Sequence, residues 1–182
     1  MTSELIDRIY ECAFVPELWP AVLDELAQLA DAEGGLLFAG RDRTLNWTAS
    51  ERLEEIFRTY VNDGWFARCS RRVCLFGGVH QPSFRVEHDF WTSEQLEANP
   101  IYRDFFRPRG LGWSAGTGLP IPTGDNIVFS VERAFGRGPI ERDYVEQLNE
   151  LRPHLARSAM FAARLGLQKA TGASETLSAL GL

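Results

Sequence analysis

Four side chains that can ligate a transition metal lie within 20 residues of one another: Cys69, Cys74, His80 and His88. Thiolate and imidazole groups are the usual ligands of tetrahedral zinc. Structural zinc sites place cysteine pairs two to four residues apart on a tight turn, whereas the spacings here are five, six and eight residues. We therefore predict no metal site, and interpret these residues as two buried thiols and two ordinary histidines.

The sequence contains no pattern typical of an enzyme. A nucleophile elbow, a phosphate-binding glycine loop and paired histidines with a carboxylate are all missing from it. The glycines of residues 112–118 precede a predicted strand rather than a helix, so they favour a β-bulge or a close backbone approach over phosphate binding. We predict a non-enzymatic protein without a cofactor. An enzyme working through Cys69 or Cys74 is the less favoured alternative, because it requires a thiol of lowered pKa.

Aromatic residues are concentrated in the middle third of the chain, where regular structure is hardest to assign. Small-molecule pockets are mostly apolar and aromatic, with a few placed polar groups. The concentration favours a cavity, and the alternative is that the rings fill a core under long loops. The residues concerned are Phe57, Tyr60, Trp65, Phe66, Phe76, Phe84, Phe90, Trp91, Tyr102, Phe105, Phe106 and Trp113.

Two groups of arginines lie within this segment, and an anion site would form if they met. A solvated charged surface is the more common outcome of such a pattern. The two groups are Arg68, Arg71 and Arg72, and Arg103, Arg107 and Arg109.

Composition indicates one folded domain. The chain has 182 residues, of which 45% are hydrophobic and 24% charged, and its net charge is -6. This charge opposes binding to nucleic-acid phosphates. The start of the chain lacks a secretory signal, no apolar run is long enough to span a membrane, and three cysteines do not form a disulfide framework. We expect a cytoplasmic protein.

Periodicity and turn signals predict an α+β fold. In residues 126–134, Ile127, Phe129 and Val131 alternate with Val128, Ser130 and Glu132, which gives one apolar face and one mixed face. The mixed face is expected to line a pocket or to meet water. We predict helices at residues 3–13, 18–29, 51–61, 93–98 and 100–106, strands at 36–39, 44–48, 113–119 and 126–134, and a further strand near Val79.

A long helix is predicted from Pro139 onward, with Pro153 bending it. Its apolar stripe has coiled-coil spacing and packs either on the sheet or on a second copy, and we expect the second copy beyond Leu155. His154 is interpreted as a surface residue, with a pH-sensitive group at an interface as the alternative. The stripe consists of Tyr144, Leu148, Leu151, Leu155, Ser158, Ala162 and Leu165.

Residues 1–167 are interpreted as one domain and residues 168–182 as a linker to a C-terminal region that lies outside this chain. The segment after Gln168 is rich in small and polar residues. Leu177, Leu180 and Leu182 have no evident partner in such a linker.

Four segments resemble the N-terminal sensor domains of LuxR-type helix-turn-helix transcription regulators, which are GAF- or PAS-like modules. They are residues 5–10 with 18–20, residues 99–105, residues 124–131 and residues 151–157. The resemblance covers most of residues 3–167. It implies a GAF/PAS-like central antiparallel sheet flanked by helices, a homodimer, and DNA contact only through a helix-turn-helix domain not present in this chain.

Residues 60–67 are similar to the acyl-homoserine-lactone receptors of that family, in which a Tyr is followed nine residues later by an Asp that accepts a hydrogen bond from the ligand amide. Tyr60 matches the Tyr, whereas Cys69 stands in place of the Asp. Because a thiol is a poor acceptor for an amide donor, Cys69 argues against a lactone and leaves a different small ligand open.

We therefore predict the small-molecule-sensing and dimerisation domain of a LuxR-type bacterial regulator, with a ligand-free dimerisation module as the alternative. No membrane contact is expected. The predicted ligand-binding residues are Tyr60, Trp65, Phe66, Cys69, Trp91, Tyr102, Phe106, Trp113 and Ser130.

Overall fold

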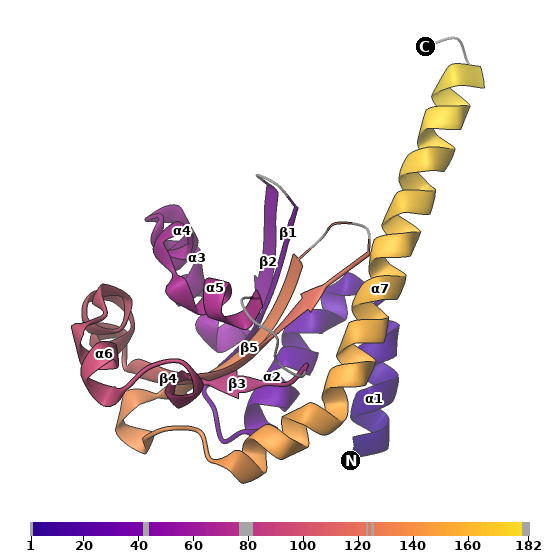
Figure 1. The fold of residues 1–182 in the computed structure, drawn as a ribbon. Coiled ribbons are helices and arrows are strands. Elements are labelled where there is room, and N and C mark those ends of the chain that lie inside the picture. Colours follow the sequence, from indigo (N-terminus) through magenta and orange to yellow (C-terminus); the bar gives the residue numbers. More distant parts are fainter. Residues whose placement is uncertain (1, 42–43, 77–81, 123, 125, 180–182) are drawn as a thin grey trace.

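A five-stranded antiparallel sheet forms the centre of the molecule, with strand order β2-β1-β5-β4-β3 (Figure 1). The structure is a computed structural model, and it describes residues 2–41, 44–76, 82–122, 124 and 126–179. The strands are β1 (Gly34–Arg41), β2 (Thr44–Ala49), β3 (Arg85–Val86), β4 (Leu111–Pro120) and β5 (Asn126–Ala134).

Helices cover both faces of this sheet, with α1, α2 and α7 on one side and α3 to α6 on the other (Figure 1). A π-helical turn at Ile101–Phe106 joins the second group, and short 3₁₀ turns connect several elements. The helices are α1 (Thr2–Glu11), α2 (Trp19–Leu29), α3 (Glu54–Asn62), α4 (Trp65–Arg68), α5 (Ser70–Phe76), α6 (Ser93–Ala98) and α7 (Arg142–Ala179). The predicted α+β class with an antiparallel sheet and a long C-terminal helix is confirmed.

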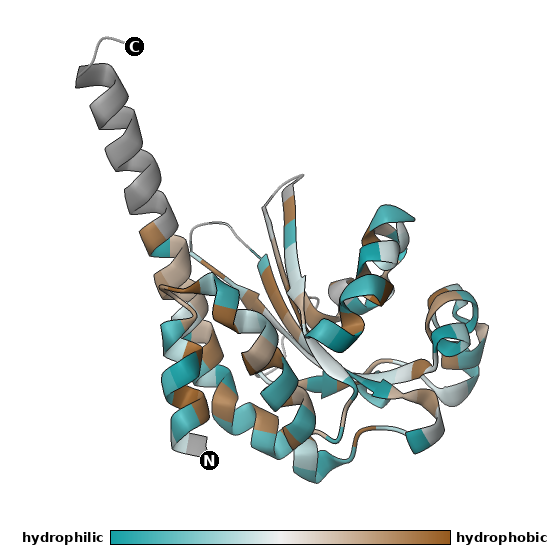
Figure 2. Cartoon of the chain, turned by 180° about the vertical axis from the view of Figure 1, so that it is seen from behind, coloured by the Kyte–Doolittle hydropathy of each residue, from teal (hydrophilic) through white to brown (hydrophobic). Residues whose placement is uncertain are grey.

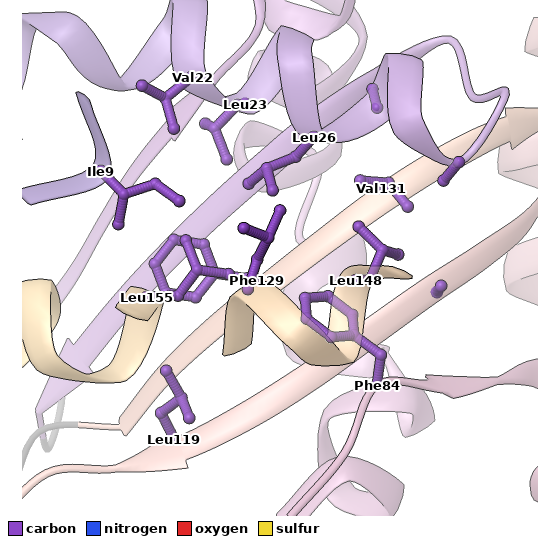
Figure 3. Packing of buried hydrophobic residues seen from close by; sticks show 14 of the residues in the cluster. Ile9, Val22, Leu23, Leu26, Phe84, Leu119, Phe129, Val131, Leu148 and Leu155 are labelled. Atoms are coloured by element: carbon purple, nitrogen blue, oxygen red, sulfur yellow. The ribbon is translucent and has the colours of Figure 1, made fainter. Parts of the chain in front are cut away.

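The first core lies between the sheet and helices α1, α2 and α7. Phe129 and Val131 of β5 pack there among leucines from the helices (Figure 3). Hydrophilic and hydrophobic residues alternate along α1 and α2, as expected of helices with one buried side (Figure 2). Burial of this stripe, rather than intrinsic helix propensity, stabilises these helices.

The second core lies on the opposite face of the sheet and is mainly aromatic. Phe57 and Tyr60 of α3 pack against Phe105 and Phe106 of the π-helical turn, and Phe38 of β1 completes the contact with the sheet. Ile127, Phe129 and Val131 of β5 lie in the first core, whereas Val128 lies in the second. The predicted alternation of β5 is therefore confirmed.

Several predicted boundaries differ from the structure. Helix α1 spans Thr2–Glu11, so it begins one residue before and ends two residues before the predicted 3–13. The strand predicted near Val79 lies outside the described residues, and the short strand β3 is found at Arg85–Val86 instead. Helix α6 agrees with the predicted range, and α3 ends at Asn62, one residue beyond the predicted end at 61.

Helix α7 begins at Arg142, three residues after the predicted Pro139. Ile140 is buried in the first core, and the Pro139 carbonyl accepts a hydrogen bond from the Arg133 guanidinium at 2.8 Å. Because these contacts hold residues 139 and 140 against the first core and the end of β5, the helix starts only after them. Asp143 lies in the first turn, where its negative charge interacts favourably with the positive end of the helix dipole.

The apolar stripe of α7 packs on this molecule's own core. Leu148, Leu151 and Leu155 are fully buried, and the Ser158 hydroxyl donates a 2.6 Å hydrogen bond to the Ile9 carbonyl of α1. Helix α1 therefore covers the stripe as far as Ser158. The expectation that the stripe faces a second copy beyond Leu155 is wrong for this part of the helix. The axis of α7 bends in the first half of the helix (Figure 1), and Pro153 lies inside the helix.

Among the described residues, none of the helices combines the length and apolar character needed to span a bilayer.

Candidate ligand-binding cavity

A cavity of about 50 Å³ lies between the sheet and helices α3 to α5. One part of its wall is aromatic, and the rest includes charged and hydroxyl side chains. The aromatic lining consists of Phe38, Phe57, Tyr60, Phe66, Phe90 and Trp91, and the polar lining includes Arg71, Arg85, Glu87, Ser114, Ser130 and Glu132.

Glycines of β4 bring helix α5 close to the sheet beside this cavity. A Cβ added at Gly118 would lie 3.1 Å from the Leu75 carbonyl oxygen and 2.9 Å from a Phe76 ring carbon. The register of β4 against β5 also shifts between Leu111 and Trp113. Both roles predicted for these glycines, close approach and a bulge, are therefore confirmed.

The predicted site residues fall into two groups. Tyr60, Phe66, Cys69, Trp91 and Ser130 line the cavity. The remaining four do not line it.

Trp65, Tyr102 and Phe106 pack in the surrounding aromatic core. Trp113 stacks between His88 and Phe135, and its indole N–H donates to the Phe135 carbonyl at 3.0 Å. These four residues are thus held by neighbouring rings or backbone, and their part in ligand binding stays a prediction.

Tyr60 and Cys69, matched by the family resemblance, lie side by side. Burial raises the pKa of the Tyr60 hydroxyl well above its usual value, and a hydrogen bond with the Cys69 side chain adds to the effect. Tyr60 is therefore a neutral hydroxyl at any physiological pH. Its ring contacts Phe57 and Phe106, which fixes its position in the wall.

The guanidinium group of Arg71, on α5, lies in the interior against the sheet. Its Nη1 atom donates to both carboxylate oxygens of Glu132, at 3.1 and 3.0 Å, and lies 3.9 Å from Glu87. The guanidinium also stacks over the Phe106 ring at 4.4 Å. A buried charge needs such partners, because an unpaired one is very costly away from water.

Glu87 is the second buried carboxylate of the cavity, with 1% of its side chain exposed. It accepts hydrogen bonds from the Ser114 hydroxyl at 2.6 Å, the Ser114 amide at 3.0 Å and the Tyr102 hydroxyl at 3.1 Å. Burial raises the pKa of this carboxyl, while Arg71 and Ser114 act in the opposite direction. Two carboxyl groups of the cavity, Glu87 and Glu132, thus lie against the guanidinium of Arg71.

The arginines considered as an anion site do not come together where their side chains are described, and the side chain of Arg72 lies outside that part. Arg68 stacks on Trp65, Arg107 on Phe135 and Arg109 on Phe105. Arg103 pairs with the adjacent Asp104 on the surface. Arg71 reaches the cavity, where Glu132 neutralises it.

No group of three metal-ligating side chains occurs in the described part of the chain, and His80 lies outside it. Burial raises the pKa of Cys74, and the neighbouring Cys69 adds to this shift. A nucleophilic thiol requires the opposite shift.

Sequence reasoning did not select Glu87 and Glu132 as site residues. Glu132 lies on the same strand face as Ser130, so the alternation of β5 could have identified it. Glu87 follows the two-residue strand β3 in a segment without clear periodicity, and no local signal indicates its burial.

No protein-family model and no curated protein matches the sequence. Solved structures do resemble it. The VqsR LBD domain from Pseudomonas aeruginosa is similar with a TM-score of 0.64 at 15% identity, over 89% of this chain and 96% of that chain. CepR2 from Burkholderia cenocepacia, described as an N-acylhomoserine lactone dependent LuxR family transcription factor, gives 0.60 at 18% identity, over 90% and 94% of the two chains.

SdiA from Escherichia coli gives a TM-score of 0.60 at 18% identity over 82% of this chain, and this chain spans 61% of the SdiA chain. SdiA has also been solved in complex with octanoyl-rac-glycerol. These similarities show that the chain has the fold of the ligand-binding domains of LuxR-type regulators.

Proposed function

We propose that this chain is the small-molecule-sensing and dimerisation domain of a LuxR-type bacterial transcription regulator that works in the cytoplasm. The observation that carries the proposal is the cavity between the sheet and α3 to α5, within a fold shared with VqsR, CepR2 and SdiA. In this proposal residues 1–167 form the GAF/PAS-like sensor, residues 168–182 form the linker, and DNA is contacted through a helix-turn-helix domain outside this chain.

The ligand acts by stabilising one conformation more than another, and it shifts the balance only by the difference in affinity. Tyr60, Phe66, Cys69, Trp91 and Ser130 are the proposed contacts. The cavity of about 50 Å³ is smaller than the roughly 300–1,000 Å³ of pockets for drug-sized ligands. A ligand of that size therefore requires the wall formed by α4 and α5 to move, which supplies the conformational change.

Native mass spectrometry of protein purified from its own host tests the sensing function. A persistent bound organic molecule, lost when the cavity is filled by Ser130→Phe, supports it. Protein that carries no ligand and is neither stabilised nor shifted by host small-molecule extracts would contradict it.

The small volume of the cavity also favours a second candidate, a ligand-free dimerisation module. Met160 and Phe161 are 41% and 46% exposed on the outer part of α7, where large apolar side chains suit an interface. Analytical ultracentrifugation of the wild type and of Met160→Glu/Phe161→Glu tests the dimer. We expect a dimer that dissociates in the double variant, and a monomeric wild type would reject dimerisation in both candidates.

A further inference from the structure

On the polar side of the cavity, two carboxyl groups lie against a single guanidinium, that of Arg71. Glu87 and Glu132 both lie against Arg71, and the described ion pairs give neither carboxylate a second cation within 4.0 Å. Arg85, which also lines the cavity, pairs with Asp89 instead. Glu87 is the carboxylate with the weaker pairing, since Arg71 lies 3.9 Å from it and 3.0 Å from Glu132.

This arrangement disfavours an anionic ligand. The Arg71 Nη1 atom already donates to both carboxylate oxygens of Glu132. A second anion beside two buried carboxylates would meet like-charge repulsion in a site with little water to screen it.

The same arrangement suits a cation. Burial raises the pKa of Glu87, so the surroundings of this carboxyl disfavour its charged form. A positive group beside it would stabilise that charge. The aromatic wall acts in the same direction, because ring faces attract ammonium groups, and rings from four separate segments line the cavity, including Phe38, Phe57 and Trp91.

We propose that the cavity selects a small organic cation, a protonated amine with a short apolar substituent, whose ammonium group binds Glu87 while the substituent packs among the aromatic rings. This inference rests on the proposed sensing function and names the class of ligand that the sensor takes. The volume of about 50 Å³ restricts the part bound without rearrangement to a few non-hydrogen atoms.

Three probes of equal chain length and different charge test this: butylammonium chloride, sodium butyrate and 1-butanol. Each is titrated into the isotopically labelled protein at pH 7 and constant ionic strength, and amide shifts are followed by NMR. The Ser114 amide donates to Glu87 and therefore reports on that carboxylate directly. We expect saturable shifts at Ser114 with butylammonium and a Kd at least tenfold lower than for the other two probes.

Glu87→Gln removes the charge while nearly preserving the shape of the side chain. It is expected to weaken butylammonium binding at least tenfold and to leave 1-butanol binding unchanged. Glu97→Gln on the exposed side of α6 is the matched control and keeps the wild-type affinities. If Glu87→Gln does not fold, the ranking of the three probes on the wild-type protein decides the question.

Butyrate or 1-butanol binding as tightly as butylammonium would overturn the inference, as would an unchanged butylammonium affinity in folded Glu87→Gln. Neither result affects the sensing function, which the copurified ligand tests independently of its charge. An uncharged or anionic molecule found by native mass spectrometry would support sensing and reject the cation.

Discussion

Asp31 shows how a single side chain connects distant parts of the chain. It adopts a positive φ of 48° after α2, accepts a 2.8 Å hydrogen bond from Arg133 of β5, and also pairs with Arg137. Arg133 in turn binds Glu141 just before α7. The sequence separates these residues by up to 110 positions, so their pairing depends entirely on the fold.

Asp31→Asn is expected to reduce the free energy of unfolding at pH 7. Hydrogen bonds from Arg133, then Arg137, lower the pKa of Asp31 in the folded state. A carboxylate with a lowered pKa stabilises the fold above its unfolded pKa of about 3.9, and that contribution is lost as the pH falls through the folded pKa. Urea unfolding at pH 7, 5 and 3 should show a difference from wild type that shrinks only at the lowest pH.

Asp7→Asn on the exposed side of α1 is the control and should stay within about 0.5 kcal/mol of wild type. A difference for Asp31→Asn that is the same at all three pH values would show that its charge has no role.

Arg71→Met is expected to destabilise the protein by about 3–5 kcal/mol, because it leaves buried Glu132 and Glu87 without their cation. Chemical denaturation at pH 7 measures the loss. Arg68→Met changes the same charge on an exposed residue that contacts Trp65, and it should cost less than about 1 kcal/mol. Equal effects of the two variants would reject the buried pairing.

The contact between α2 and β1 illustrates how helices approach the sheet. A Cβ at Gly35 would lie 2.5 Å from the Leu23 carbonyl oxygen, which is backbone and cannot rotate away. Hydrophobic spacing predicts that α2 packs on the sheet, but this distance appears only when the two elements are placed together.

Gly35→Ala is therefore expected to destabilise the protein by about 1–3 kcal/mol through overpacking. The midpoint of urea unfolding measures the change. Gly136→Ala serves as control, since no atom lies within 4 Å of its added Cβ, and it should be neutral. A neutral Gly35→Ala would mean that α2 can shift away from β1 at little cost.

The molecule as a whole consists of two cores that share one sheet. Strand β5 lies between β1 and β4 and is buried over most of its length, whereas β2 is at an edge. Such a central strand opens only when both cores are disrupted, so its exchange reports on global unfolding.

Native-state hydrogen exchange should therefore be slowest for the amides of Val128 to Glu132 and faster for β2. Measurement by NMR at pH 7 gives the opening free energy of each amide. Slowest exchange in α3 or α4 instead would show that the aromatic core, rather than the shared sheet, is the most stable part.

The sequence by itself determined the period of each element and the two faces of β5, because side-chain direction in a strand or helix follows from local geometry. It also indicated Tyr60, Cys69 and Ser130 as site residues, and in the structure all three line one cavity. Only the tertiary structure decided what covers each face. Helix α1 packs against the apolar stripe of α7 as far as Ser158, and Glu87 lies beside Arg71 at the second core. Such contacts join distant segments of the chain, so no local sequence pattern predicts them.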